Sequence, residues 1–237
     1  MNIVISQSMY FPWVGILEQI RLADIFVHYD DVQYSKGGFL NRVQIKTANG
    51  IKWLTLPLDQ YHLGDNINEI KLNKKNDWRC QHRDILAQAY QNAPFKNEML
   101  SLVDTVFSNS SNFLSDIARE SMMQLIKYFG LENKCEFIDS LQFGIGGSST
   151  KRVYDIVRKC NGKRYITGHG ARNYLEHELF EKSGISVDYM KYELMEYDQL
   201  HGAFTPYVSS LDLIANCGRE GAKVICSKTI NWKEFVK

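Results

Sequence analysis

The chain opens with apolar segments whose spacing predicts strands and helices in alternation. Residues 2–6 predict a short buried strand, and apolar residues at helical spacing over 16–23 predict a helix after the loop 7–13. Residues 25–27 predict the next strand, and the polar run 28–31 follows it directly. Since open α/β sheets bind ligands beyond the carboxyl ends of their strands, this polar run marks a candidate site.

The next segment predicts a β-hairpin. Strand-like apolar residues extend from Asn41 to Leu58 and are interrupted at Asn49 and Gly50, a pair that is a strong hairpin signal. Residues 63–75 contain Gly, Asn and Lys without helical periodicity, so they predict a strand edge and a loop.

Helical patterns fill the middle of the chain. Asp77 can cap one helix, and Ser111 or Asn112 can cap a second that ends at Gly130. Residues 149–159 are amphipathic and predict a third helix.

The last third predicts a β-α-β unit and one more helix. A strand over 164–166, a helix over 171–182 and a strand over 187–192 form the unit, and Ser209 can cap a helix over 211–216. We therefore predict an α/β fold, with a mostly parallel sheet flanked by helices. A β-hairpin extension in the first third and a helical insertion in the middle complete it.

Size and composition fit an ordinary globular protein. A length of 237 residues suits a single domain over 1–237, with possible lobes 1–75 and 76–237 that share a cleft. Lys and Arg number 28 against 27 Asp and Glu, so no strong positive field exists to bind nucleic acid. Residues 1–6 lack a basic leader and a long apolar run, so we expect a cytoplasmic protein without membrane insertion.

No metal or disulfide chemistry is indicated. The five cysteines are scattered without a C-x-x-C pair, and the histidines lack H-x-x-x-H spacing, so we expect buried thiols and no metal site. The G-x-S-x-G, Walker and G-x-G-x-x-G motifs are also missing.

The first candidate binding segment is the aromatic loop that precedes the first helix. Tyr10, Phe11, Pro12 and Trp13 are followed by Gly15, which concentrates three rings in four residues. Aromatic faces at this position could stack on a base or a sugar ring. The alternative is a hydrophobic plug that seals the core.

The second candidate is the densest polar cluster in the chain, which comprises His28, Asp30, Asp31, Gln33, Lys36, Asn41 and Arg42. A carboxylate here could deprotonate or orient an amine or hydroxyl. Lys36 and Arg42 could hold a diphosphate, and Gln33 and Asn41 could bind sugar hydroxyls. The alternative is a solvated turn with salt bridges.

Two further positions can carry chemistry. Gly168, His169 and Gly170 lie between a predicted strand and helix, where backbone N–H groups can bind a phosphate or carboxylate. A tight turn with a solvated His169 is the alternative. His82 lies on the helix that Asp77 caps, either as a surface residue or as a base that reaches into a cleft.

Many residues match one known pattern. In the first part these are Tyr10, Pro12, Trp13, Gly15, Ala23-Asp24, Phe26-Val27, Tyr29-Asp30, Val32-Gln33-Tyr34, Lys36 and Asn41-Arg42. The middle matches at Trp53-Leu54, Pro57, Trp78, His82, Tyr90 and Ala93-Pro94-Phe95. The end matches at Gly168, Gly170-Ala171, Tyr174-Leu175, Phe180, Gly184-Ile185, Gln199, Phe204, Pro206, Ser209, Asp212-Leu213 and Asn216. By these residues the chain resembles the WbqC-like family of bacterial proteins.

The resemblance implies a role in surface glycan assembly, because the genes of this family tend to lie among those for lipopolysaccharide and other surface glycans. The chain departs from the family pattern at three prolines, where it has Ser8, His169 and Arg219. We expect His169 and Arg219 to affect which substrate is bound. Neither residue belongs to the family pattern, so the resemblance assigns no role to them.

The main hypothesis is a transferase that N-acylates or aminoacylates the amine of a nucleotide-linked amino sugar. In this scheme Asp30 or His82 is the general base, and the loop with Tyr10, Pro12 and Trp13 stacks on the base or sugar. Gly168 and Gly170 supply backbone donors for a phosphate or an oxyanion.

We expect no tightly bound cofactor, and the acyl donor, which an acyl or aminoacyl carrier could deliver, stays open. The alternatives are a nucleotidyl or adenylyl transferase of the same pathway and a non-catalytic sugar-binding or scaffold protein. The main hypothesis requires that the loops 10–15 and 167–170 meet over one hollow.

Overall fold

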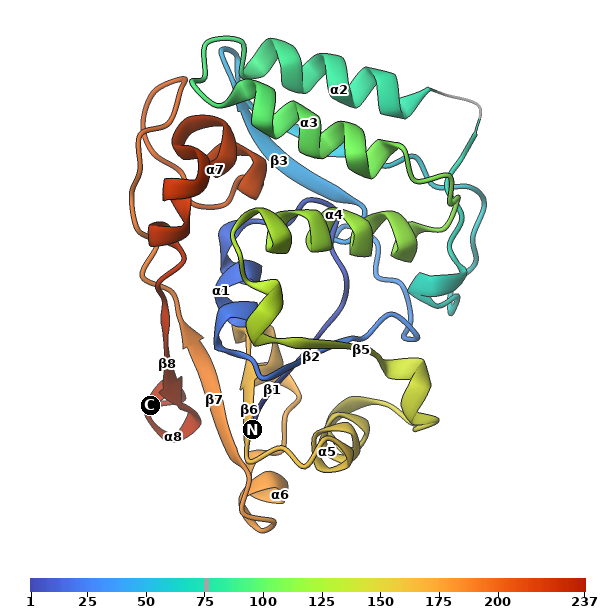
Figure 1. Ribbon diagram of the computed structural model, residues 1–237. Helices are drawn as coiled ribbons and strands as arrows, with labels where there is room; N and C mark the ends of the chain where they lie inside the picture. The colour runs from blue at the N-terminus through green and yellow to red at the C-terminus, as the bar shows by residue number, and fades with distance from the viewer. Residues whose placement is uncertain (75–76) are drawn as a thin grey trace.

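A six-stranded sheet forms the centre of the protein, in the order β5-β2-β1-β6-β7-β8 (Figure 1). The computed structural model describes residues 1–74 and 77–237. The strands are β1 (Asn2–Ser6), β2 (Ile25–His28), β5 (Glu136–Asp139), β6 (Arg164–Thr167), β7 (Ser186–Lys191) and β8 (Lys228–Asn231). All neighbouring pairs are parallel except β7 and β8. The predicted mostly parallel α/β sheet is therefore confirmed.

The order in which the chain adds strands to the sheet reverses between β1 and β6. The chain proceeds outward from β1 through α1 (Val14–Leu22) to β2 and later to β5, then crosses through α5 (Ser149–Lys159) to β6 on the other side of β1. In doubly wound sheets the ligand crevice lies outside the carboxyl ends of the strands at such a reversal.

Helices cover both faces of the sheet because alternate strand residues are apolar on both sides. Ile3 and Ile5 of β1 pack with α5 and α6 (His177–Glu181), whereas Val4 packs into the larger core on the opposite face. Figure 1 shows α5 and α6 on one side, with α2 (Trp78–Ala89), α3 (Lys96–Phe107) and α4 (Leu114–Tyr128) on the other. The last elements are α7 (Ser210–Cys217) and α8 (Trp232–Phe235).

The predicted hairpin and the helical insertion are both present. β3 (Arg42–Thr47) and β4 (Gly50–Thr55) pair in a sheet of their own, and α2, α3 and α4 lie between this hairpin and β5 in the chain. The prediction that Ser111 or Asn112 caps α4 is wrong, because Phe113 is the N-cap residue and the helix has no side-chain cap. Ser111 instead accepts a hydrogen bond from the Phe113 N–H at 3.1 Å, just before the helix. The boundary between the two possible lobes falls on residues 75 and 76, which lie outside the described residues.

Some elements differ from the sequence predictions. The helix predicted over 171–182 is wrong in its first part, because a 3-10 turn (His169–Asn173) precedes the short α6. Thr150 fixes the break, since its hydroxyl donates to the Tyr174 carbonyl at 2.8 Å and accepts from the Glu176 N–H at 3.1 Å. α3, β5 and β8 were not predicted. The two strands have no buried residue, so they lack the apolar run that reveals the equally short β2 and β6.

In the part of the chain that the structure describes, every helix is too short or too polar to cross a lipid bilayer.

Candidate functional site

A hollow of about 540 Å³ lies beyond the carboxyl ends of β6 and β7. Its wall consists mostly of aromatic and apolar side chains: Trp13, His169, Met190, Lys191, Tyr192, Leu194, Tyr207, Ile230 and Phe235. Small-molecule sites in proteins have volumes of about 300–1,000 Å³ and this kind of lining. The hollow is therefore large enough for a ligand with one or two rings.

The two loops that the sequence analysis selected meet at this hollow. Trp13 belongs to the loop after β1 and His169 to the loop after β6, so they come from the two strands at the reversal of the sheet. The Tyr192 ring packs against both, with its centroid 4.9 Å from that of Trp13 and 5.2 Å from that of His169. Gly168 passes close to Tyr192, because a Cβ added there would lie 3.6 Å from the tyrosine hydroxyl.

The hydrogen bond of His169 determines which of its ring nitrogens is basic. His169 Nε2 lies 2.7 Å from the Met190 carbonyl oxygen, and a carbonyl oxygen can only accept. Nε2 therefore carries the proton, and Nδ1 of the neutral ring carries the free lone pair. Among the described residues Nδ1 has no hydrogen-bond partner, so it is available to a ligand in the hollow.

Gly15 is required by the position of the Trp13 indole. A Cβ added at residue 15 would lie 2.2 Å from the indole ring, which is far inside van der Waals contact. Trp13 also packs against Tyr207, with 5.7 Å between the ring centroids. The Trp-x-Gly spacing therefore fixes the indole as one wall of the hollow.

We expect Gly15→Ala to displace the indole and to lower the free energy of unfolding by about 1–3 kcal/mol, because overpacking a tight contact forces side chains to shift. Gly170→Ala is the matched control, since a Cβ at Gly170 would meet no atom within 4 Å. Urea unfolding compares the two variants. Equal stability of the two would contradict the packing argument.

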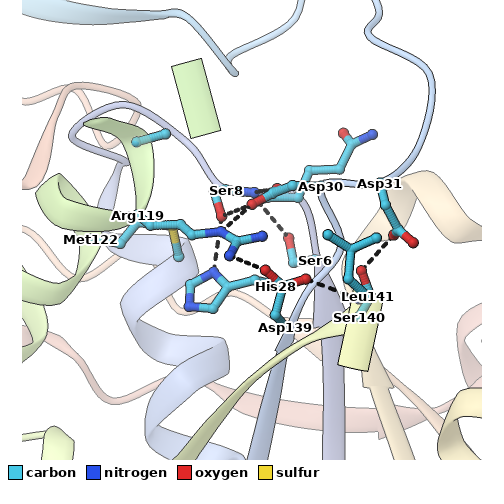
Figure 2. Close-up of polar contacts among 12 residues, drawn as sticks. Ser6, Ser8, His28, Asp30, Asp31, Arg119, Met122, Asp139, Ser140 and Leu141 are labelled. Atoms are coloured by element: carbon cyan, nitrogen blue, oxygen red, sulfur yellow. Dashed lines mark hydrogen bonds and ion pairs between the residues drawn. The ribbon is translucent and has the colours of Figure 1, made fainter. Parts of the chain in front are cut away.

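Two members of the polar cluster after β2, His28 and Asp30, belong to a buried network with Ser8 and Arg119 (Figure 2). The Asp30 carboxylate accepts hydrogen bonds from the Ser8 N–H at 2.8 Å and the Ser8 hydroxyl at 2.7 Å, and from Arg119 Nε at 2.6 Å. Arg119 also binds Asp139 at the end of β5. Asp30 has no exposed surface, so the network closes the carboxyl ends of β1, β2 and β5 from inside.

The direction of the hydrogen bonds in this network argues against a serine nucleophile. Ser8 Oγ donates its proton to Asp30, so it must accept the bond from His28 Nδ1 at 2.9 Å. His28 therefore does not withdraw a proton from Ser8, as the base of a Ser-His pair would. The Asp30 carboxylate is also buried in an ion pair. In this geometry it does not reach the hollow, which argues against its predicted role as general base.

His82 is likewise a buried residue. Tyr10 donates its hydroxyl proton to His82 Nδ1 at 2.9 Å, and the other hydrogen bond of the ring goes to the Thr55 backbone. Tyr10 has no exposed surface and Pro12 is buried, so the plug interpretation describes the first half of the aromatic loop. Only Trp13 of that loop lines the hollow.

The residues predicted to bind phosphate and sugar hydroxyls lie elsewhere. Asn41 donates to the Leu56 carbonyl and accepts from the Tyr34 hydroxyl, and Arg42 donates to the Gly38 carbonyl and stacks on Trp53. Gln33 and Lys36 are exposed on the same loop. None of these four side chains lines the hollow.

Burial lowers the pKa of both His28 and His82 to about 4. The pKa of histidine in the unfolded chain is near 6.5, so between pH 6.5 and 4 the unfolded state binds more protons than the folded state. The free energy of unfolding should therefore fall as the pH falls through this range, by about 3 kcal/mol for each histidine.

Urea unfolding at several pH values tests this expectation. His82→Gln removes one of these two histidines, so the stability of the variant should depend less steeply on pH between 6.5 and 4. If wild type and variant have the same slope, His82 is not responsible.

The sequence analysis did not select three rings that line the hollow, namely Tyr192, Tyr207 and Phe235. Tyr192 had a usable signal, because it ends a predicted strand and so lies at the sheet edge where ligands bind. Phe235 had none, since neither β8 nor α8 was predicted. Within the described residues no group of three or more His, Cys, Asp or Glu side chains is arranged to hold a metal ion.

Comparisons with known proteins agree with the resemblance seen in the sequence. The pattern of the WbqC-like protein family matches residues 7–224. The uncharacterized protein Rv1507c of Mycobacterium tuberculosis is 30% identical over 224 residues, which are 92% of this chain and 95% of that protein. No solved structure matches significantly. The family match and the similarity to this relative both extend over most of the chain, which therefore belongs to the WbqC-like protein family.

Proposed function

We propose that this protein is a group transferase that binds a nucleotide-linked amino sugar in the hollow and acylates or aminoacylates the sugar amine. One observation carries the proposal. Trp13 and His169, from the loops after β1 and β6, line the same hollow, and both pack against the Tyr192 ring. A stacking surface and a ring nitrogen are thereby present in one hollow.

The aromatic lining supports a ligand that contains a ring. Trp13 and Tyr207 offer faces on which a base or sugar ring can stack, and both residues keep part of their surface exposed. A nucleotide-linked sugar supplies two such rings, joined by a diphosphate.

His169 supports the transfer step. The sugar amine attacks the carbonyl carbon of the acyl donor, so a C–N bond forms and the bond from that carbon to the sulfur or oxygen of the donor breaks. His169 Nδ1 accepts the proton that the amine nitrogen loses and then donates it to the leaving thiolate or alkoxide, so the histidine ends the step neutral. Nε2–H stays bound to the Met190 carbonyl and holds the ring in place.

The resemblance to the family supports a pathway for this proposal. Because the genes of the WbqC-like family tend to lie among those for surface glycans, we infer that the product enters lipopolysaccharide O-antigen assembly. The acyl group would arrive on a small thioester or on an acyl or aminoacyl carrier.

Mass spectrometry of reaction mixtures tests the proposal. The protein is incubated with UDP-, dTDP- and GDP-linked amino sugars and a panel of acyl thioesters and aminoacyl carriers. We expect one sugar nucleotide to gain the mass of an acyl group as the donor is consumed. Consumption of none of the donors, with every sugar nucleotide recovered unchanged, would count against acyl transfer.

The sheet order favours a second candidate, nucleotidyl transfer. The reversal between β1 and β6 is the position where doubly wound sheets bind nucleotides, and the hollow lies beside it. Release of pyrophosphate from a nucleoside triphosphate in the presence of a sugar phosphate would identify this reaction. Binding of the sugar nucleotide without turnover would instead indicate a non-catalytic binding protein.

A further inference from the structure

Two lysines face each other at the edge of the hollow. Lys191 of β7 and Lys228 of β8 are direct partners in the antiparallel pair of strands. Side chains of such partners project to the same side of the sheet with their Cβ atoms about 5 Å apart, and like charges in this position destabilise the pair. Both side chains are exposed.

One lysine lines the hollow and the other lies on the strand beside it. Lys191 lines it directly. Lys228 precedes Ile230 by two residues on the same strand, so the two side chains share a face, and Ile230 lines the hollow as well.

The positive charges of the two lysines have no counter-ion in residues 1–74 and 77–237. Among the described residues, no carboxylate lies within ion-pair distance of either lysine, and neither ammonium group makes a hydrogen bond to the chain. Glu193 is only two residues from Lys191 but forms an ion pair with neither lysine. A repulsive arrangement beside a ligand-sized hollow indicates a site for negative charge.

We propose that Lys191 and Lys228 bind the diphosphate of a nucleotide whose ring lies in the hollow. The assignment rests on the proposed function for the nature of the ring. It replaces the predicted diphosphate contacts of Lys36 and Arg42, which do not line the hollow, and Arg42 is committed to the Gly38 carbonyl and Trp53.

One of the two lysines, Lys228, lies outside the segment that matches the family pattern. Lys228 follows residue 224, where the match to the family pattern ends, whereas Lys191 precedes it. The strand β8 therefore contributes both a lysine and an apolar wall to the hollow from a part of the chain that the family pattern does not include.

Calorimetric titration of the full chain tests the proposal with matched pairs of ligands. UDP, dTDP, GDP and ADP are compared with their nucleosides, which carry the same rings without phosphate. We expect the preferred diphosphate to bind at least about tenfold more tightly than its nucleoside. Lys191→Gln and Lys228→Gln should each remove about tenfold of diphosphate affinity and leave nucleoside affinity unchanged.

Lys163→Gln is the control, because Lys163 is an exposed lysine that precedes β6, at the opposite edge of the sheet. It should bind diphosphate like the wild type. The two glutamine variants in the lysine pair should unfold at the same or a higher temperature than the wild type, since each removes a like-charge contact. A lowered unfolding temperature in both would indicate a structural role and overturn the proposal.

The remaining outcomes are also decisive. Equal affinities for nucleoside and diphosphate overturn the phosphate site, even if acyl transfer is found. Diphosphate binding that depends on the lysines, without any transfer, supports the site and overturns the proposed reaction. Pantetheine and its 4′-phosphate provide a second pair of ligands. If the 4′-phosphate binds through the lysines and no nucleoside diphosphate does, the nucleotide assignment is overturned.

Discussion

Asp30→Ala should lower the free energy of unfolding by about 3–5 kcal/mol, because removing one partner of a buried ion pair leaves the other charge uncompensated. Asp30 has no exposed surface, and its carboxylate accepts hydrogen bonds from Ser8 and Arg119. The substitution leaves the Ser8 N–H and hydroxyl without their acceptor and takes one of two carboxylates from Arg119. Urea unfolding monitored by circular dichroism measures the loss.

Asp104→Ala is the matched control for this experiment. Asp104 also forms an ion pair with an arginine, in this case through two nitrogens, but both Arg83 and Asp104 are nearly half exposed. Exposed ion pairs contribute about 0–1 kcal/mol, so this variant should be almost as stable as the wild type. Equal losses at the two positions would mean that the buried network does not stabilise the fold as its geometry indicates.

The expected outcome at Asp30 bears on catalysis. A base must reach the substrate in a plausible pose, and the carboxylate of Asp30 is turned into the protein. Loss of turnover in an Asp30 variant would therefore have to be separated from loss of folded protein, by expressing turnover per folded molecule.

Periodicity along the chain was enough to predict the fold class, because the first strand, the hairpin and the helix over 149–159 each bury a regular pattern of side chains. It was not enough for β5 and β8. Neither strand has a buried residue, and their positions at the two ends of the sheet depend on neighbours that are distant in sequence.

The candidate site shows the same limit. The sequence identified the loops that contain Trp13 and His169, because strand ends, glycines and exposed rings are local features. It could not show that Arg119, which is 89 residues from Asp30, would bury that carboxylate. Polar residues at a strand end are compatible with an open site and with a sealed network, and only the tertiary packing distinguishes the two.

His169→Gln should lower the rate constant of transfer by about 10²–10⁴-fold and leave sugar nucleotide affinity within a few-fold of the wild type, since this is the usual contribution of a general base. Glutamine can still donate to the Met190 carbonyl through its amide, so the hydrogen bond that positions His169 has a substitute. What the variant lacks is the basic nitrogen. Single-turnover measurements with the sugar nucleotide found by mass spectrometry give the rate constant.

His201→Gln controls for the removal of a histidine as such. His201 is exposed, and its Nε2 donates to the Ala89 carbonyl at 2.7 Å, the same length as the bond from His169 to Met190, but it does not line the hollow. The two variants therefore lose chemically equivalent groups, and only one of these groups lies beside Trp13 and Tyr192. A normal rate for His201→Gln and a strongly reduced rate for His169→Gln would assign proton transfer to the hollow. If His169→Gln transfers the acyl group at the parent rate, the proton goes to water or to the leaving group, and His169 acts only in binding.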